Sequence, residues 1–344
     1  MGLDTVRFIS LLFTALALGT GLAHLLELPN KINLSRDDYL TVQQIYRGWA
    51  LLGIIVVVAL LCPRPAAAWG FEAHKFITEQ MIALLPAELR PIFERRKAYL
   101  LERCVDPDLW RVVGWTEEDP NHFVDLDYFG AYPFTELPHD YDRAVQKFGR
   151  AVIHEQGLLP WRVAEFYGRL QRTFESLGRP SPPTFAAENV VLFSAILAHY
   201  VEDGHVPLHS VVNYDGQKTN QLGVHSRWEG ELFERNRTKF TIAPQAVKPI
   251  ADPREYMFTT LLASYRLSDG VLAADRKAAA GREFYDDGYF ATFGADQLAV
   301  MQQRLNDSIA SVAAMIAGAW EQAGRPVVPL EVPRTPRPIV RPKG

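Results

Sequence analysis

Cysteine is scarce in this sequence, and its charges of opposite sign nearly balance. The 344 residues include only two cysteines, Cys62 and Cys104, and two thiols cannot build a framework of disulfides. Lys and Arg number 36 against 40 Asp and Glu, so the formal charge is −4 and polyanions are not generally attracted. Nucleic acid can still be a substrate, but not a tightly held partner. With 48% hydrophobic and 22% charged residues, a largely disordered chain is excluded.

The N-terminal part carries two apolar runs. Residues 8–26 contain no Lys, Arg, Asp or Glu, and a stretch of this length can span a bilayer. Residues 49–62 are short for a span but match the hydrophobic region of a signal peptide, and Ala66-Ala67-Ala68 is the pattern that signal peptidase reads. We expect a hydrophobic leader over 1–68, with a transmembrane helix at about 8–26, a second, signal-like segment at about 49–62 and cleavage after Ala68.

A polar connector with three cations (Lys31, Arg36 and Arg47) separates the two runs. Cations beside membrane segments favour the cytoplasmic side, so the residues after the second run are expected outside the membrane. The protein is therefore expected to be exported (periplasmic or extracellular), or membrane-anchored with its domain outside. One alternative is a pair of transmembrane helices that are not cleaved. Another is that the leader comes from a gene fusion or from a misplaced start of the reading frame.

From Trp69 onward the hydrophobic pattern is helical. Apolar residues recur three and four apart from Phe71 to Leu85, and no run shows the sustained alternation of a strand. We expect an all-α, multi-helix domain over 69–323, followed by a Pro/Arg-rich disordered tail over 324–344. Further helices are expected at Glu88–Arg103, Tyr141–Gln156, Trp161–Leu177, Ala186–Val201, Ser226–Asn236, Arg254–Leu272 and Asp296–Glu321.

The densest group of metal-binding residue types follows an apolar helix. His199 and Asp203 are four residues apart at its end, so their side chains share one face. Gly204 then releases the chain, and Pro207 keeps it extended. His209 can therefore reach back toward the pair from a loop.

Other candidates lie on both sides of this group. His225 and Glu229 repeat the four-residue spacing on another helix, and imidazole–carboxylate pairs on rigid helices are what zinc coordination needs. Upstream, Asp108 and His122 supply another carboxylate and imidazole, and His74 lies in the first helix after the expected cleavage site. Each histidine taken alone is typical of a hydrogen-bonded structural residue, but the spacing of the set favours a metal site.

Together these residues resemble a known ligand set. Trp69…His74, Asp108…His122, His199-x3-Asp203-x5-His209 and His225-x3-Glu229 are similar, in kind and order, to the zinc ligands of the zinc-dependent phospholipase C / S1–P1 nuclease superfamily. The resemblance runs from Trp69 to about Glu229, and the leader has no counterpart in it. It implies an all-α domain with three Zn²⁺ ions in a cleft.

The resemblance also implies a place for each ligand. One ion would take Asp108, His122 and His199, with Asp203 bridging to another ion. A second would take His209, His225 and Glu229, and the third would take His74, Asp203 and the free amine and carbonyl of Trp69. Because an amide nitrogen is a poor zinc ligand and a terminal amine a good one, the third site requires cleavage before Trp69.

The chemistry that the resemblance implies is hydrolysis of phosphodiesters. Clustered zinc ions lower the pKa of bound water toward about 7 and offset charge on phosphoryl oxygens. Asp108 is expected to double as a general base and Arg111 to contact phosphate. Asp106 competes with Asp108, which we prefer because D-L-W-R is similar to the D-x-x-R of the family. His205 is expected behind the ligands or at the rim of the site.

The substrate divides the family into two branches. Glu229 is typical of the phospholipases, whereas the spacing of Trp69 and His74 is typical of the nucleases, whose disulfides are absent here. The acidic domain, the expected membrane proximity and Glu229 favour a phospholipase C-like hydrolase without an obligate protein partner. An S1/P1-type single-strand nuclease is the alternative, and a membrane-anchored, non-catalytic zinc-binding protein is the second. Aromatic residues suited to either substrate are Trp110, Phe123, Tyr128, Phe129 and Tyr200.

Overall fold

The computed structural model describes residues 34–36, 38 and 70–331. The chain divides into two units, Met1–Pro65 and Ala66–Gly344. Within the first unit, the Ser35 hydroxyl donates to the Asp38 carboxylate (2.6 Å) and accepts its backbone N–H (3.2 Å). The expected transmembrane helix, the signal-like segment, the cleavage site and Trp69 all lie outside the described residues. Within the described ranges, no helix combines the length and the apolar character needed to cross a membrane.

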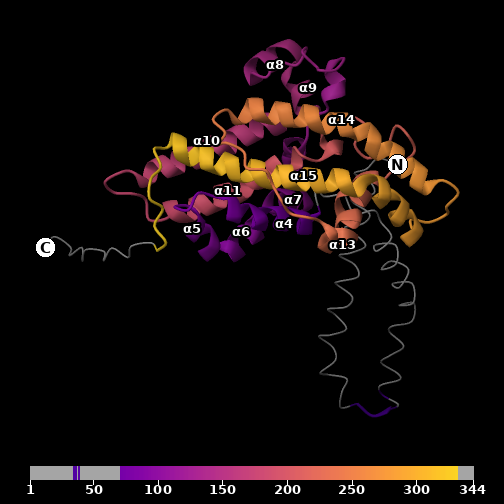
Figure 1. Cartoon of the computed structure of the whole chain (residues 1–344), viewed down its shortest axis with the longest axis horizontal. Coiled ribbons are helices and arrows are strands. Elements are labelled where there is room, and N and C mark those ends of the chain that lie inside the picture. The colour runs from indigo at the N-terminus through magenta and orange to yellow at the C-terminus, as the bar shows by residue number, and fades with distance from the viewer. Residues whose placement is uncertain (1–33, 37, 39–69, 332–344) are drawn as a thin grey trace. The chain divides into compact units, whose positions relative to one another are not determined.

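The part of the second unit that the structure describes is all-α, with helices and loops and no strand. Its two longest helices, α14 (Pro253–Ala279) and α15 (Asp287–Gln322), pack against each other and run side by side (Figure 1). Both begin at an aspartate cap: the Asp252 carboxylate accepts the Glu255 N–H and the Asp286 carboxylate accepts the Tyr289 N–H. The helical class expected from the sequence is confirmed.

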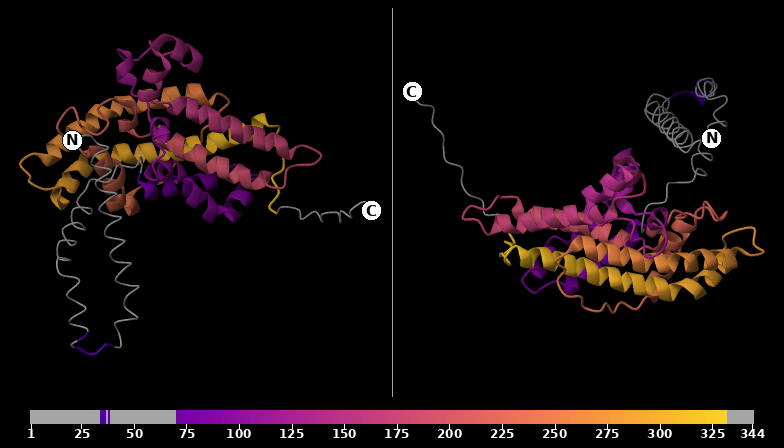
Figure 2. Two further views of the ribbon diagram at one scale, coloured as in Figure 1. Left: turned by 180° about the vertical axis from the view of Figure 1, so that it is seen from behind. Right: turned by 90° about the horizontal axis from the view of Figure 1, so that it is seen from above.

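A second pair of helices, α10 (Leu159–Leu177) and α11 (Ala186–Asp203), packs against the first pair (Figure 2). The sequence of α11 is apolar almost all round, and its residues from Ser194 to Asp203 are all buried. A helix that is apolar all round belongs in the interior. The C-terminal end of α11, which carries His199 and Asp203, therefore lies inside the domain.

Short helices cover this core. They are α4 (Phe71–Met81), η2 (Ile82–Leu84), α5 (Arg90–Arg95), α6 (Lys97–Arg103), α7 (Asp106–Val112), η3 (Thr116–His122), η4 (Leu126–Phe129), α8 (Tyr141–Phe148), α9 (Arg150–Glu155), η5 (Pro207–Ser210), α12 (Val224–Ser226), the π-helical turn η6 (Arg227–Leu232), α13 (Phe233–Asn236) and η7 (Arg237–Lys239). Helices α8 and α9 lie at an edge of the domain (Figure 1).

Two expected helices are longer than expected: Arg254–Leu272 continues to Ala279, and Asp296–Glu321 begins at Asp287. Three others are interrupted or irregular. Glu88–Arg103 is interrupted at Arg96, whose φ of −104° and ψ of 16° leave the helical region. Tyr141–Gln156 is divided at Gly149, where φ is +86°, a conformation that favours glycine. Ser226–Asn236 contains a π-helical turn in place of a continuous α-helix. Helix α7, which carries Asp108, was not among the expected helices.

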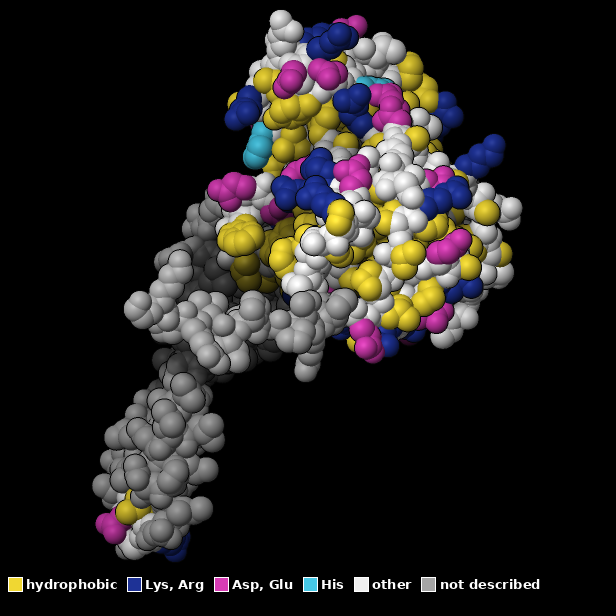
Figure 3. Space-filling view, turned by 90° about the vertical axis from the view of Figure 1, so that its left-hand side faces the viewer, with side chains coloured by type: hydrophobic (Ala, Val, Ile, Leu, Met, Phe, Trp, Pro, Cys, Tyr) yellow, Lys and Arg dark blue, Asp and Glu magenta, His cyan; other side chains and the backbone are white. Residues whose placement is uncertain are grey.

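Part of the expected C-terminal tail packs on the domain. The Trp320 indole N–H donates to the carbonyl of Pro326 (2.9 Å), Val328 is buried, and Arg95 pairs with Glu331 (2.8 Å). These contacts make residues 324–331 part of the surface of the domain, while 332–344 lie outside the described residues. Figure 3 shows one face of the described part, on which acidic and basic side chains are scattered among apolar ones.

Candidate metal centre

The structure brings eight of the nine expected metal ligands together, and the ninth, Trp69, lies outside the described residues. Each of three groups places one ligand atom per residue within 4.8 Å of the others, and every member is buried. The groups are His74, His199 and Asp203; Asp108, His122 and His199; and His209, His225 and Glu229.

Asp203 lies at the centre of this arrangement. Its Oδ2 is 2.9 Å from His122 Nδ1 and 3.4 Å from His199 Nε2, one turn earlier on α11. Its Oδ1 is 3.6 Å from His74 Nε2 and 3.8 Å from His209 Nδ1. A carboxylate with a different imidazole beside each oxygen has the geometry expected of a bridging ligand.

Helix α7 brings Asp108, and not Asp106, to the other candidate ligands. Asp108 is 1% exposed, and its Oδ1 lies 3.9 Å from both His122 Nδ1 and His199 Nε2. Asp106 instead pairs with Arg103 (3.3 Å) and belongs to none of the three groups. The two carboxylates are two residues apart on a helix, so they point in different directions.

The third group joins two segments that are close in sequence. His225 Nε2 lies 2.9 Å from Glu229 Oε2 and 3.0 Å from His209 Nε2. The pair spans the junction of α12 with the π-helical turn η6, and such turns occur frequently at functional sites. The four-residue spacing does place the two side chains together here.

Hydrogen bonds on the far side of three imidazole rings fix their orientation. His74 Nδ1 lies 2.5 Å from Glu202 Oε2, His199 Nδ1 lies 2.9 Å from the Cys104 carbonyl, and His209 Nδ1 lies 2.6 Å from the His122 carbonyl. Because these acceptors take the ring proton, the Nε2 of each ring is left with a free lone pair toward the cluster. Such partners are typical of metal-bound histidines.

Several buried polar atoms of the cluster have no hydrogen-bond partner among the described residues. They are His74 Nε2, Asp108 Oδ2, Asp203 Oδ1 and Glu229 Oε1. A buried polar group without a partner costs free energy, and a buried unpaired carboxylate costs more. Cations among these atoms would satisfy them, so the residues present fit a metal site.

Burial sets the charge state of the cluster. It raises the pKa of Asp108 to about 6 and also raises the pKa values of Asp203 and Glu229 above their usual range. It lowers the pKa of His122, and likewise that of His199 and of His209, well below the ordinary value. These three imidazoles are therefore neutral near pH 7, as metal ligation requires. The pKa of His225 is instead raised, because the Glu229 carboxylate outweighs the effect of burial.

Arg111 is the cation beside the cluster. It lies on α7 one turn after Asp108, with Nη1 3.3 Å from Asp108 Oδ1 and Nε 2.8 Å from Asp119 Oδ1. Its guanidinium thus has a fixed direction next to the ligands. This position suits the phosphate contact expected for Arg111.

A polar network that the sequence did not reveal lies behind His122. Glu118 Oε1 is 3.8 Å from His122 Nε2, and the Glu118 carboxylate accepts hydrogen bonds from the Tyr200 hydroxyl and from Arg162 Nη2 (3.2 Å). Tyr200 is fully buried, so its ring serves this network and not a substrate. Of the expected aromatic platforms, Tyr128 is exposed and Phe129 is buried.

His205 lies behind the ligands and not at a rim. It is buried, and its Nε2 is 3.0 Å from the Ser311 hydroxyl of α15. Arg304 Nε donates to the His205 carbonyl (2.9 Å), and Arg304 Nη2 donates to Ser264 (2.8 Å). These bonds hold the turn between Asp203 and His209 against α14 and α15.

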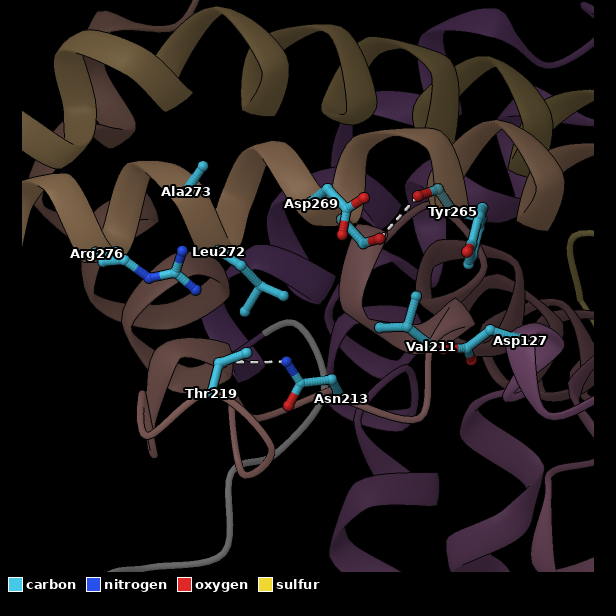
Figure 4. Close-up of a pocket in the computed structure, with 10 residues that line it drawn as sticks. Asp127, Val211, Asn213, Thr219, Tyr265, Asp269, Leu272, Ala273 and Arg276 are labelled. Atoms are coloured by element: carbon cyan, nitrogen blue, oxygen red, sulfur yellow. Dashed lines mark hydrogen bonds between the residues drawn. The ribbon is translucent and has the colours of Figure 1, made fainter. Parts of the chain in front are cut away.

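A separate pocket lies between α14 and the segment that joins η5 to α12 (Figure 4). Its volume is about 310 Å³, and Asp127, Asn213 and Thr219 line it opposite Tyr265 and Arg276 of α14. No expected metal ligand lines it. Asp127 accepts the Val212 N–H (2.8 Å), so this wall supports the chain between His209 and His225.

No known protein-family model matches this chain, and no curated protein matches it.

Proposed function

We propose that this chain is a zinc-dependent hydrolase of phosphodiester bonds, of the phospholipase C type. The observation that carries the proposal is the geometry of the eight buried ligands, which form three groups with ring nitrogens and carboxylate oxygens directed inward. Imidazole and carboxylate without cysteine is a donor set typical of catalytic zinc. Clusters of such ions are used for attack on phosphate esters.

The residues around the cluster have parts in this chemistry. Bound zinc supplies Lewis acidity, which activates water and offsets charge on phosphoryl oxygens. Asp108, whose pKa burial raises to about 6, is poised to accept a proton near neutral pH. Arg111 holds a guanidinium beside Asp108, where it can donate to a phosphoryl oxygen of the substrate.

An apolar segment next to Asp108 supports a lipid substrate. In the seven residues that follow Asp108, four large apolar side chains are exposed: Leu109 at 38%, Val112 at 61%, Val113 at 72% and Trp115 at 59%. Exposed apolar side chains in such density mark an interaction surface. Beside a phosphodiesterase centre, this surface suits the acyl part of a phospholipid.

A single-strand nuclease is the second candidate, and one contact favours it. The ring of Tyr214 lies 6.2 Å from that of His225, and Tyr214 is 45% exposed. An exposed aromatic ring beside the cluster is a platform on which a base can stack. The near balance of charge gives this candidate no further support.

Processing and location form part of the proposal. Trp69 would complete the group of His74 and Asp203 with its terminal amine, which exists only after cleavage behind Ala68. The domain would then act outside the membrane, exported or held there by the leader. N-terminal sequencing of the secreted protein tests this directly, with Trp69 as the expected first residue.

The function is tested by metal content and by parallel assays. Wild type and His199→Ala are compared for zinc per chain, for release of diacylglycerol and for release of nucleotides from single-stranded DNA and RNA. His154→Ala, at an exposed histidine outside the cluster, is the matched control. We expect about three zinc ions and lipid hydrolysis in wild type and in the control, and loss of both in His199→Ala.

The other outcomes are equally informative. Activity on single strands alone would replace the phospholipase proposal by the nuclease. Zinc without turnover of either substrate would identify a non-catalytic zinc-binding protein. Full phosphodiesterase activity in zinc-free protein would end the metal proposal altogether.

A further inference from the structure

Arg227 lies between the expected ligands His225 and Glu229 in the sequence, but its side chain is buried against α14 and α15. Its Nη2 and Nε are 2.8 Å and 3.1 Å from Asp275 Oδ1 on α14. Arg227 is only 4% exposed. Burying a charge costs free energy unless the charge is paired, so the guanidinium and the carboxylate must keep close contact in the folded protein.

The same pair is tied to the start of the ligand segment. Arg227 Nη1 donates to the Leu222 carbonyl (2.8 Å) and Nη2 to the Gln221 carbonyl (3.2 Å). The Gln221 amide in turn donates to Asp275 Oδ2 (2.7 Å) and to the Leu272 carbonyl (2.8 Å). Both oxygens of Asp275 therefore hold the chain just before and just after His225. Figure 4 shows this stretch of α14 from Leu272 to Arg276.

Helix α15 supplies a third support. The Tyr289 hydroxyl donates to Asp275 Oδ1 and accepts from Arg227 Nε (3.1 Å). The Tyr285 ring centroid lies 3.9 Å from the guanidinium carbon, in cation–π geometry. One guanidinium thus joins the ligand segment to both long helices of the domain.

The segment that carries His225 and Glu229 needs such support because its own helix is short and irregular. α12 has three residues, and Arg227 begins the π-helical turn that carries Glu229. Short helices and π turns are not stable by themselves, so tertiary contacts must hold them. The 2.9 Å approach of His225 to Glu229 depends on this turn.

We propose that Arg227 and Asp275, with Tyr289, form a positioning pair that sets the geometry of the His209–His225–Glu229 group. This inference rests on the proposed metal centre. Arg227 acts through the backbone of its own turn, because it lies two residues from each ligand and is fastened to fixed points on α14 and α15. The pair positions only this one of the three groups. The ligands of the other two groups are held by the packing of α4, α7, η3 and α11.

The test compares wild type, Asp275→Asn, Tyr289→Phe and Leu170→Ala, each expressed from the full sequence and purified after cleavage behind Ala68. Leu170 is buried on α10 and serves as a control for a general loss of stability. Each protein is stripped and titrated with Co²⁺, and the metal bound per chain, the visible spectrum and the thermal midpoint are recorded. Co²⁺ absorption reports the geometry of the site independently of activity.

We expect Asp275→Asn to lose about one bound metal of three, or to bind one of them about 10–100-fold more weakly, with a changed spectrum. Tyr289→Phe keeps the ion pair, so it folds and shows a smaller change in the same direction. Leu170→Ala lowers the thermal midpoint but keeps the wild-type stoichiometry and spectrum.

Two results would overturn the inference, and they can be told apart. If both variants keep the wild-type metal content and spectrum while only their thermal midpoints fall, the pair is merely structural and the metal centre stands. If wild type binds no metal, the proposed function fails and this inference fails with it. Should Asp275→Asn not fold, Tyr289→Phe decides between these results.

Discussion

His74 and Glu202 meet in the interior of the domain, with His74 Nδ1 2.5 Å from Glu202 Oε2 and both side chains fully buried. The second oxygen of Glu202 accepts the Thr78 hydroxyl (2.7 Å), so one carboxylate binds two residues of α4 to α11. A carboxylate that takes the outer proton of a histidine leaves the inner nitrogen free and makes it a stronger ligand. Glu202 would therefore orient a ligand of the proposed metal centre without being a ligand itself.

The first prediction concerns Glu202→Gln. An amide accepts a hydrogen bond less strongly than a carboxylate, so His74 should be less well oriented and less basic. We expect zinc affinity to fall about 10–100-fold while the helical content stays unchanged. Competition with a chromophoric chelator measures this, and Glu188→Gln on the exposed start of α11 is the matched control. Equal affinities for the two variants would contradict the part given to Glu202.

The second prediction concerns removal of metal. Without cations, the buried carboxylates of Asp108, Asp203 and Glu229 each have an oxygen with no partner in the described part of the chain. Chelation should therefore lower the thermal midpoint, and added zinc should restore it. At free zinc about 1,000-fold above its dissociation constant, each site contributes about 4 kcal/mol. Calorimetry of stripped and reloaded protein measures this, with magnesium as the control ion. An unchanged midpoint after stripping would speak against a metal site here.

The third prediction gives the pH dependence of that effect. Burial raises the pKa of Asp108 to about 6, and in the unfolded chain it is about 4. The metal-free fold thus gains stability from this proton below about pH 4 and loses it as the pH rises through about 6. Zinc displaces this proton from Asp108. The gain in stability on adding zinc should therefore be small near pH 5 and reach its maximum near pH 7.5. An equal effect at both pH values would show that no proton is displaced.

The fourth prediction concerns Gly157, which supports the loop beside His122. Its φ is +105°, and an added Cβ would lie 2.1 Å from the Phe123 carbonyl oxygen. Gly149 also has a positive φ (+86°), but a Cβ there would meet no atom within 4 Å. Gly149→Ala should cost about 1–3 kcal/mol from backbone strain alone, and Gly157→Ala distinctly more. Urea unfolding measures both, and equal costs would rule out the clash.

The sequence allowed prediction of those parts of the site that depend on local spacing. Four residues on a helix bring His199 to Asp203, and the apolar residues before them indicate that the pair is buried. The approach of His74, Asp108 and His122 to this pair has no local cause, and only the order of residues in a resemblance suggested it. It depends on the packing of α4, α7 and η3 against α11.

Supporting residues were missed for a related reason. Glu202 is next to Asp203 in the sequence but about 100° around the helix, and its partner His74 is far away along the chain. Likewise, nothing in the sequence near Arg227 predicts that its guanidinium donates hydrogen bonds to Asp275 and Tyr289. Gly149 was a visible signal for a helix break, whereas nothing local marks Arg96.

The last prediction concerns Asp125, which lies three residues after His122 and outside the three groups. Its side chain is 7% exposed, and its Oδ1 has no hydrogen-bond partner among the described residues. Burial raises its pKa to about 7, and the charge of Asp127 adds to the effect, while Lys218 opposes it. In the unfolded chain its pKa is about 4.

A raised pKa means that the folded protein holds a proton that the unfolded chain releases. The stability from this proton is complete below about pH 4 and is lost as the pH rises through about 7. Asp125→Asn removes the ionisation, so it should stabilise the protein by about 2–4 kcal/mol near pH 8 and by much less near pH 5. Urea unfolding of zinc-free protein at both pH values measures this, with Glu231→Gln at an exposed position as the control. If Asp125→Asn gained no more stability over wild type at pH 8 than at pH 5, the prediction would be wrong. Asp125 would then be charged in the folded protein at little cost, in contact with water or a cation.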